Sequence, residues 1–298
     1  MGGGRCEGCA LVHGEDGAAA EHRQDGGGHC GPGAQHRRRP DLPGADQPHQ
    51  CREALGGCRP ECVCRRCRQH PARRQGRGQR PKAQHTAVFV PGTGTVFAGV
   101  PGQMDHIRRL QKAAEDKAGD ENVAVVSWLG YETPNWLDGS VAQSDRGDAG
   151  APLLRNFTKG LRVAEGDNGV CSHLTLMGHS YGSYVVGVAA RDAGGANAND
   201  ILALGSPGMG VEGAWQLNVD PKHVWVGTAK DDFIQTFTGT VLGDGPQYRD
   251  FDAQRIQIDT SGHGGYWDFG PGGASESLQN QGRIIAGRPP TLAPRYPR

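Results

Sequence analysis

The first 80 residues of this 298-residue chain contain no Ser, Thr, Asn, Lys, Ile, Phe, Tyr or Trp. Gly, Arg, Ala, Pro, Gln, His and Cys dominate there instead. Such a segment has almost nothing to bury, so it cannot offset the roughly 1–2 kcal/mol of backbone entropy per residue that folding removes. The composition predicts that residues 1–84 are disordered, and that a globular domain occupies 85–298, where Trp, Tyr and Ile appear between Gly and Pro.

Net charge and long apolar runs are also missing. The formal net charge is zero, which gives no long-range attraction to nucleic acid or an anionic membrane, so we expect a small-molecule or acyl-ester substrate and no nucleic acid. No run approaches the roughly 18 apolar residues of a membrane span. Residues 1–20 lack the apolar core of a signal peptide, which predicts a cytoplasmic protein. The oligomeric state is left open.

Cysteine is concentrated where the other residue types are missing. Eight of the nine cysteines lie at or before position 67, including the CxxC pairs Cys6/Cys9 and Cys64/Cys67. A zinc site would need regular ligand spacing and some apolar residues, and a disulfide framework would need a secretion signal. We therefore expect no metal and no organic cofactor. A GC-rich coding sequence read in the wrong frame yields this composition, so we hypothesise a frameshift or misassigned start for residues 1–84.

From residue 85 onward, short apolar runs alternate with helical patterns. Strands are predicted over residues 86–90, 123–128, 172–177, 201–204, 223–227 and 255–258, and helices over 104–118, 153–164 and 184–191. Strands that alternate with helices or long crossovers indicate a mostly parallel sheet with helices on both faces. The fold class is therefore α/β.

A candidate nucleophile stands between one of these strands and the helix that follows it. Residues 178–182 read GHSYG, which is the GxSxG pattern with Ser180 at its centre. In a nucleophile elbow the serine occupies a sharp strand-to-helix turn, and the flanking Gly178 and Gly182 allow the two backbones to pass closely. The alternative is a glycine-rich turn whose serine only caps the helix.

A serine hydroxyl needs a base and an orienting carboxylate, in the chain order Ser, acid, His. Asp231 and Asp232 follow the strand at 223–227, and spacing does not separate them. His263 follows the strand at 255–258 and is the only histidine after these acids. We treat His179, the neighbour of the nucleophile, as a supporting residue and not as the base.

The tetrahedral intermediate also needs N–H donors for its oxyanion. In this fold they come from the residue after the nucleophile and from the loop after an early strand. This assigns the oxyanion hole to the N–H groups of Tyr181 and Thr93, with Gly94 as second choice. Trp128, Tyr131 and Trp136 are candidates for the lining of an apolar acyl pocket, but aromatic residues near the top of a sheet are more often core or lid. Ser206 is a candidate wall residue.

Seven blocks resemble, in order, an α/β-hydrolase family of high-GC Gram-positive bacteria that was formerly a domain of unknown function. They read TAVFVPGTGT, SWLGYETP, LMGHSYGSYVVGVAAR, LALGSPGMGV, VWVGTAKDDFI, GHGGYWD and SESLQNQGRIIAG, and they span about residues 85–287. The resemblance implies the α/β-hydrolase fold and a Ser, Asp, His triad. The acid block of the family has Pro and Ile after its Asp. Asp232 therefore matches better than Asp231, although Phe233 stands in place of the Pro.

The resemblance also implies that His263 belongs to the histidine block, and that a longer helical segment, unlike residues 1–84, precedes the domain in most members. The expected function is a serine hydrolase with Ser180, Asp232 and His263 as its triad. An ester substrate is favoured over an amide only because esterases are more common than peptidases among proteins of this fold. Two alternatives remain: an acyltransferase with the same triad, and a catalytically silent binding module, whose sign would be a broken triad.

Overall fold

The computed structural model describes the backbone of residues 9–12, and residues 83–95, 100–135, 140–167, 169–239, 241–270, 272–294 and 296. The chain divides into two compact units, Met1–His13 with Gly56–Arg298, and Gly14–Leu55. All described residues belong to the first unit. Most of residues 1–84, to which the frameshift hypothesis applies, lies outside the described residues. The CxxC cysteines other than Cys9 also lie outside them.

A seven-stranded sheet forms the centre of the described unit, in the order β1-β3-β2-β4-β5-β6-β7. Its strands are β1 (Cys9–Val12), β2 (His85–Val90), β3 (Val123–Leu129), β4 (His173–His179), β5 (Asp200–Leu204), β6 (Val224–Gly227) and β7 (Gln254–Arg255). Strands β2 to β7 pair in parallel, and only β1 is antiparallel to its neighbour among these pairs. The mostly parallel sheet is therefore confirmed.

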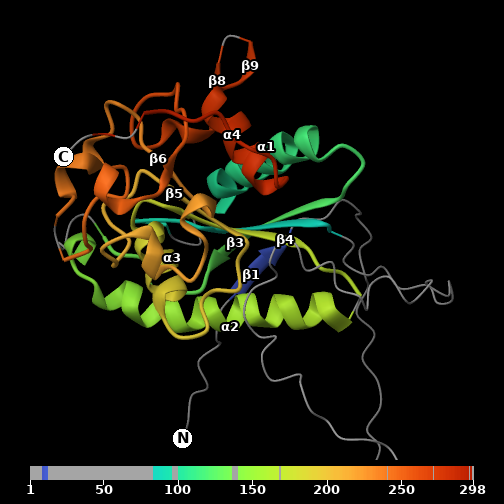
Figure 1. Cartoon of the computed structure of the whole chain (residues 1–298), viewed down its shortest axis with the longest axis horizontal. Helices are drawn as coiled ribbons and strands as arrows, with labels where there is room; N and C mark the ends of the chain where they lie inside the picture. Colours follow the sequence, from blue (N-terminus) through green and yellow to red (C-terminus); the bar gives the residue numbers. More distant parts are fainter. Residues whose placement is uncertain are drawn as a thin grey trace, which may run out of the picture. The chain divides into compact units, whose positions relative to one another are not determined.

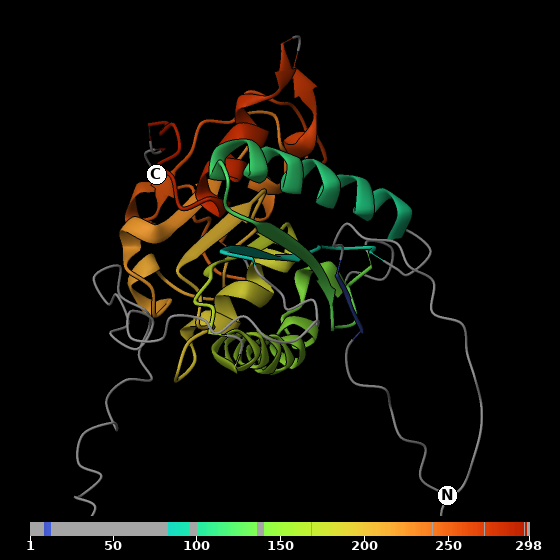
Figure 2. The same cartoon turned by 90° about the vertical axis from the view of Figure 1, so that its right-hand side faces the viewer.

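Four helices cover the sheet, two on each face (Figures 1 and 2). They are α1 (Val100–Ala118), α2 (Asp145–Asp167), α3 (Tyr181–Arg191) and α4 (Glu276–Ile285). Helices α1 and α4 lie on one side of the sheet, and α2 and α3 lie on the other. Each face has its own buried core, so the prediction of helices on both faces is confirmed.

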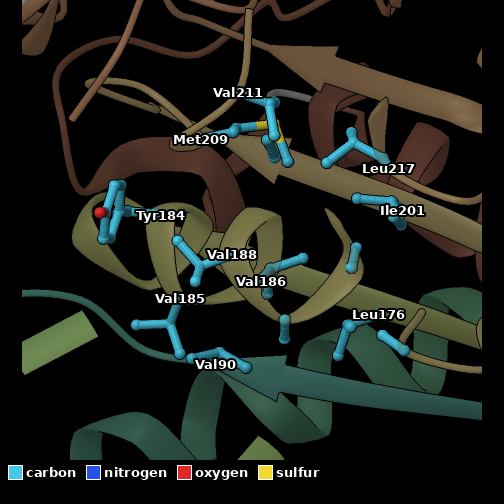
Figure 3. Packing of buried hydrophobic residues seen from close by; sticks show 14 of the residues in the cluster. Val90, Leu176, Tyr184, Val185, Val186, Val188, Ile201, Met209, Val211 and Leu217 are labelled. Carbon is cyan, nitrogen blue, oxygen red and sulfur yellow. The ribbon is translucent and has the colours of Figure 1, made fainter. Parts of the chain in front are cut away.

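Helix α3 shows why the apolar residues of this sequence fold into layers. Residues 181–190 are all buried, as expected of a helix that is apolar around its whole circumference. Val185, Val186 and Val188 pack with Val90 and Leu176 of the neighbouring strands (Figure 3). Burial of apolar area contributes about 25 cal/mol per Å², so these side chains stabilise the packing of β4 against α3 and with it the turn between them.

All three predicted helices begin before their predicted starts, and the fourth helix was not predicted. Helix α2 begins at Asp145, eight residues before the predicted start, and contains Pro152. Gly147 and Gly150 lie within this helix because tyrosine side chains pack closely against them. A Cβ at either position would lie within 2.7 Å of a Tyr184 or Tyr131 side-chain atom. Helix α4 was not predicted, although Ser275 caps it by accepting a hydrogen bond from the Leu278 N–H at 3.2 Å.

Strand β1 departs from the predicted disorder of residues 1–84 at four positions. Cys9–Val12 pairs with β3 in the register Cys9↔Leu129 to Val12↔Val126. The outer edge of β3 offers backbone donors and acceptors, and CALV is an apolar run that can pair with them. Gln84 is also tied to the sheet, because its carbonyl accepts a hydrogen bond from His173 N–H at 2.7 Å. The rest of residues 1–82 lies outside the described part of the chain.

Short elements complete the described unit. They are the 3-10 turns η2 (Ser140–Ala142), η3 (Ala214–Gln216), η4 (Pro221–His223), η5 (Phe233–Phe237), η6 (Arg249–Phe251) and η7 (Gly265–Trp267), with the strands β8 (Phe269–Gly270) and β9 (Gly273–Ala274) of a hairpin. No described helix combines the length and the apolar character that crossing a bilayer requires.

Candidate active site

The strand order locates a crevice before any side chain is considered. From β2 the chain passes to β3 on one side and then to β4 on the other, so the direction of winding reverses between β2 and β4. In open α/β sheets, ligands bind outside the carboxyl ends of the strands at such a reversal. The loop after β2 holds Thr93, and the turn after β4 holds Ser180, so two predicted site residues meet at this point.

Ser180 has a strained backbone conformation in the turn between β4 and α3. Its φ of 54° and ψ of −131° lie in a region that non-glycine residues rarely adopt. A Cβ at Gly178 would lie 2.5 Å from the backbone of Ser183, and one at Gly182 would lie 2.2 Å from the carbonyl oxygen of Val90. The two glycines are therefore required by close backbone approach, as the sequence predicted.

Hydrogen bonds hold this strained turn in place. The Ser180 N–H donates to the carbonyl oxygen of Leu204 at 2.9 Å. Ser183 Oγ donates to the Ser180 carbonyl oxygen at 2.6 Å and lies 2.7 Å from Ser206 Oγ. The Ser180 side chain makes none of these bonds. Its Oγ is buried and has no hydrogen-bond partner among the described residues.

The structure separates the two neighbouring acids. Asp232 Oδ1 and Oδ2 lie 2.9 and 3.0 Å from His263 Nδ1. Asp231 instead accepts a hydrogen bond from the Gly262 N–H at 2.9 Å, at the base of the histidine loop. The second ring nitrogen of His263, Nε2, is buried and has no hydrogen-bond partner among the described residues.

Asp232 has an environment that favours its charged form. Burial alone would raise the pKa of Asp232, but hydrogen bonds from His263, Tyr266 and the Ile234 N–H outweigh it and hold the pKa below its ordinary value. Tyr266 donates its hydroxyl to Asp232 Oδ2 at 2.5 Å and accepts the Ala229 N–H at 3.1 Å. An ionised Asp232 fixes the proton of His263 on Nδ1 and leaves Nε2 as the acceptor.

His179 supports the histidine loop, in the role that the sequence suggested. Its Nε2–H donates to the carbonyl oxygen of His263 at 2.8 Å. Burial, assisted by the nearby His263, lowers the pKa of His179 to about 3. His179 is therefore neutral at ordinary pH and cannot compete with His263 as a proton acceptor.

The loop after β2 lies directly beside the nucleophile. A Cβ at Gly92 would lie 3.2 Å from Ser180 Oγ. The Gly94 N–H donates to the Pro134 carbonyl oxygen at 2.9 Å. Gly94, the second choice as an oxyanion donor, therefore already has an acceptor for its N–H. Tyr181 is the first residue of α3, and N–H groups of a first helical turn have no acceptor within their helix. Thr93 and Tyr181 thus remain the two candidates.

A small apolar pocket adjoins Ser180. Its volume is about 10 Å³, and its lining consists of Val141, Ala142, Ser180, Tyr181, Pro207, Ile234, Phe237 and Leu242. A larger, open groove of about 830 Å³ lies elsewhere, along Tyr184, Arg191 and Trp215, and none of the predicted catalytic residues lines it. Of these two cavities, the small pocket is the one that adjoins Ser180, the candidate nucleophile.

The predicted pocket residues lie elsewhere. Trp128 and Tyr131 are stacked at 6.2 Å in the core, and Tyr131 donates its hydroxyl to the Pro91 carbonyl oxygen at 2.7 Å. They support the loop after β2 and do not line the pocket. Ser206 forms a hydrogen bond with Ser183 Oγ and does not line the pocket. Its neighbour Pro207 does line it. Trp136 lies outside the described residues.

Comparison with known proteins places this site in a family. A family model described as alpha/beta hydrolase matches residues 69–241, which is more than half of the chain. The chain belongs to this family. The part of this hydrolase that the structure describes contains no group of three or more His, Cys, Asp or Glu side chains arranged to hold a metal ion.

Two mycobacterial proteins are similar to this alpha/beta hydrolase, and both are uncharacterised. One, from Mycobacterium tuberculosis (strain CDC 1551 / Oshkosh), is 37% identical over 161 residues, which cover 53% of this chain and 24% of the relative. The other, from Mycobacterium bovis (strain ATCC BAA-935 / AF2122/97), is 36% identical over 166 residues, which cover 53% of this chain and 60% of the relative. The chain thus spans less than two thirds of either relative.

Among solved structures, esterase PE8 has a TM-score of 0.46 and 16% identity, over 69% of this chain and 93% of that chain. A Trichoderma reesei cutinase in complex with a phosphonate inhibitor has a TM-score of 0.36 and 21% identity, over 53% of this chain and 66% of that chain. At these identities the likeness concerns the fold alone.

Sequence reasoning gave no role to Tyr266, whose hydroxyl reaches Asp232 from three positions after His263. The signal was present in the block GHGGYWD of this hydrolase, because a buried tyrosine hydroxyl needs a polar partner. Leu242 and Ile234, which line the pocket, were missed for another reason. They are ordinary apolar residues, and only folding brings them next to Ser180.

Proposed function

We propose that this protein is a serine hydrolase that cleaves an ester through an acyl-enzyme on Ser180. One observation carries the proposal: Ser180 Oγ and His263 Nε2 are both buried at the site without a hydrogen-bond partner among the described residues, while Asp232 holds the other nitrogen of His263. Buried polar atoms are rarely left unpaired in folded proteins, so an unpaired nucleophile and an unpaired base mark a site that a substrate completes.

Acylation begins when His263 Nε2 takes the proton of Ser180 Oγ as the oxygen attacks the ester carbonyl. Collapse of the tetrahedral intermediate breaks the bond to the alkoxy group, which leaves as an alcohol after it receives the proton from His263 Nε2. Water then attacks the acyl-enzyme, again with His263 as base, and the products are a carboxylic acid and free Ser180. Asp232 stabilises the imidazolium in both steps.

The oxyanion of each intermediate is held by the N–H groups of Tyr181 and Thr93. One well-placed donor of this kind contributes about 3–4 kcal/mol to transition-state stabilisation. The loop that carries Thr93 is braced for this role, since Tyr131 and Thr133 donate their hydroxyls to the carbonyl oxygens of Pro91 and Thr95 at 2.7 and 2.8 Å.

The deciding experiment is covalent labelling of the full chain with a fluorophosphonate probe. Wild type is expected to label at a single serine and to hydrolyse p-nitrophenyl acetate, and Ser180→Ala is expected to lose both properties. Ser261→Ala is the matched control, because this serine is exposed and lies two residues from His263. A folded wild type that neither labels nor turns over an ester would instead indicate a binding module.

An acyltransferase would pass the labelling test, because it uses the same acyl-enzyme. Product analysis in the presence of a competing alcohol separates the two activities. We expect free acid as the main product. A dominant product in which the acyl group is transferred to the alcohol would contradict hydrolysis as the function.

A further inference from the structure

We propose that the acyl group accepted by this enzyme is acetyl-sized and uncharged, so that its substrates are acetate esters. This inference rests on the proposed function and names its substrate class. It follows from the pocket of about 10 Å³ beside Ser180. A space of roughly 10–15 Å³ by this measure holds about one water molecule. One methyl group takes a comparable space, so we expect acyl groups longer than acetyl to be poor substrates.

The position of the pocket identifies it as the acyl side of the site. The leaving alcohol must receive its proton from His263, so the alkoxy group must lie next to that side chain. Ser180 and Tyr181 line the pocket, and His263 does not. The pocket therefore adjoins the nucleophile and the oxyanion donor but not the base. The acyl substituent of a bound ester points in this direction.

The alcohol side of the site has a different character. Phe233 packs against His263 with the ring centroids 4.8 Å apart, and its side chain is 47% exposed. A leaving group that touches His263 therefore extends toward solvent past an apolar ring. We expect selectivity for the acyl part of the ester and tolerance of different alcohols.

The walls of the pocket limit the charge of the acyl group as well as its length. Among the described residues, the lining apart from Ser180 consists of apolar residues and Tyr181, whose hydroxyl is its one side-chain polar group. That hydroxyl is engaged, since it donates to the Gln143 carbonyl oxygen at 2.7 Å and accepts the Gly147 N–H at 3.0 Å. A carboxylate on the acyl group would lose its hydration here without gaining a partner, so succinyl-type esters are excluded.

Leu242 is the wall that sets the depth. Its side chain is 2% exposed, and its carbonyl oxygen accepts the Gly210 N–H at 2.8 Å, so the backbone at this position is anchored. Its neighbours Val241 and Gly243 line the open groove of about 830 Å³. We therefore expect that shortening the Leu242 side chain enlarges the pocket while the backbone at this position stays in place.

The test is a series of p-nitrophenyl esters, acetate, butyrate and octanoate, with the full chain and with active sites counted by fluorophosphonate labelling. Wild type is expected to show a kcat/KM for acetate at least tenfold above that for butyrate, with octanoate lower still. Leu242→Ala is expected to raise the butyrate to acetate ratio at least tenfold. Val241→Ala is the matched control and is expected to leave the ratio unchanged, because Val241 is 67% exposed and does not line the pocket.

The outcomes separate this inference from the proposed function. If Ser180 labels and wild type prefers octanoate or butyrate, the acetate inference fails while the serine hydrolase stands. If Ser180 does not label in folded protein, both fail. Should Leu242→Ala not fold, Leu242→Val makes a smaller change at the same wall, and an unchanged ratio in a folded Leu242 variant would also overturn the inference.

Discussion

The two edges of the sheet carry almost the same cluster of residues, yet only one of them has the features of an active site. At the carboxyl edge, Asp232 binds His263 Nδ1 and the Tyr266 hydroxyl. At the amino edge, Asp200 binds His223 Nδ1 at 2.8 Å and Trp225 Nε1 at 2.7 Å. Each site thus has a buried aspartate, a histidine held through Nδ1 and an aromatic donor.

The difference lies in what remains after these bonds are made. At the carboxyl edge, the second nitrogen of His263 and the hydroxyl of Ser180, a residue in a strained turn, are buried and unpaired among the described residues. At the amino edge, the His223 side chain is 42% exposed, and a second histidine, His173, lies 2.6 Å from Asp200. Residue types alone therefore do not identify a catalytic cluster. The feature that distinguishes the carboxyl edge is Ser180, a serine in a strained turn whose buried hydroxyl has no partner among the described residues.

The sharpest way to test this comparison is the same substitution at both edges. Asp232→Asn is expected to lower kcat/KM by about 10⁴-fold, because the amide would stabilise the wrong tautomer of His263. Asp200→Asn is expected to leave kcat/KM within about twofold, because the site is remote, and to lower the unfolding free energy by about 1–3 kcal/mol. Ester hydrolysis and urea unfolding measure the two effects. A large loss of activity in folded Asp200→Asn would remove the distinction between the edges.

The aromatic donors allow a smaller, second test. Tyr266→Phe removes a hydrogen bond to an ionised carboxylate, worth about 1.5–3 kcal/mol, so kcat is expected to fall about 10- to 100-fold. Loss of this donor also raises the pKa of Asp232, so the acid limb of the pH–rate profile is expected to move to higher pH. Trp225→Phe is the counterpart at Asp200 and is expected to change stability only. An unshifted acid limb in Tyr266→Phe would show that Tyr266 has only a structural role.

The fold was largely predictable because its signals are local. The strand before Ser180 and the helix after it are rich in apolar residues, and Gly178 and Gly182 each stand two positions from the serine. Helix α4 was not predicted, although Ser275 and Glu276 are ordinary helix-start signals, because its large apolar residues are few: Leu278, Ile284 and Ile285. Cys9–Val12 was missed because its pairing depends on the distant edge of β3.

The pocket could not be predicted, for a physical reason. Its walls come from four separate loops, and residues such as Val141, Pro207 and Leu242 have no sequence signal other than being apolar. Trp128 and Tyr131 were candidates for the lining, but Trp128 belongs to the core and Tyr131 packs against it, which is the more common role of such aromatic residues. Sequence patterns locate groups that do chemistry far better than they locate the surfaces that select a substrate.

The amino edge also predicts a dependence of stability on pH. The hydrogen bond to Asp200 raises the pKa of His223, while bonds from His173, His223 and Trp225 outweigh burial and lower the pKa of Asp200. The His223 contribution is complete below the unfolded pKa of about 6.5 and is lost as pH rises through the raised folded value. The Asp200 contribution is complete above about 3.8 and is lost as pH falls through the lowered one.

Urea unfolding of wild type and His223→Gln between pH 5 and pH 9 measures this effect. The difference in unfolding free energy is expected to be largest near pH 5–6 and to shrink toward pH 9. Because His223 is partly exposed, solvent screening keeps the change below about 1 kcal/mol. A difference that grows with pH would contradict the ion pair.

The smallest expected effect concerns the two neighbouring acids, which spacing in the sequence did not separate. Asp231 accepts the Gly262 N–H through Oδ1, and an asparagine retains an oxygen that can accept the same bond. Asp231→Asn is therefore expected to keep kcat/KM within about threefold of wild type, a small surface-type effect beside the loss in Asp232→Asn. Asp231→Ala, which removes the acceptor and frees the loop that carries His263, is expected to lower kcat more than Asp231→Asn does. If Asp231→Asn instead lost activity as Asp232→Asn does, the charge of Asp231 would have to act on His263, and the assignment of Asp232 as the orienting acid would be wrong.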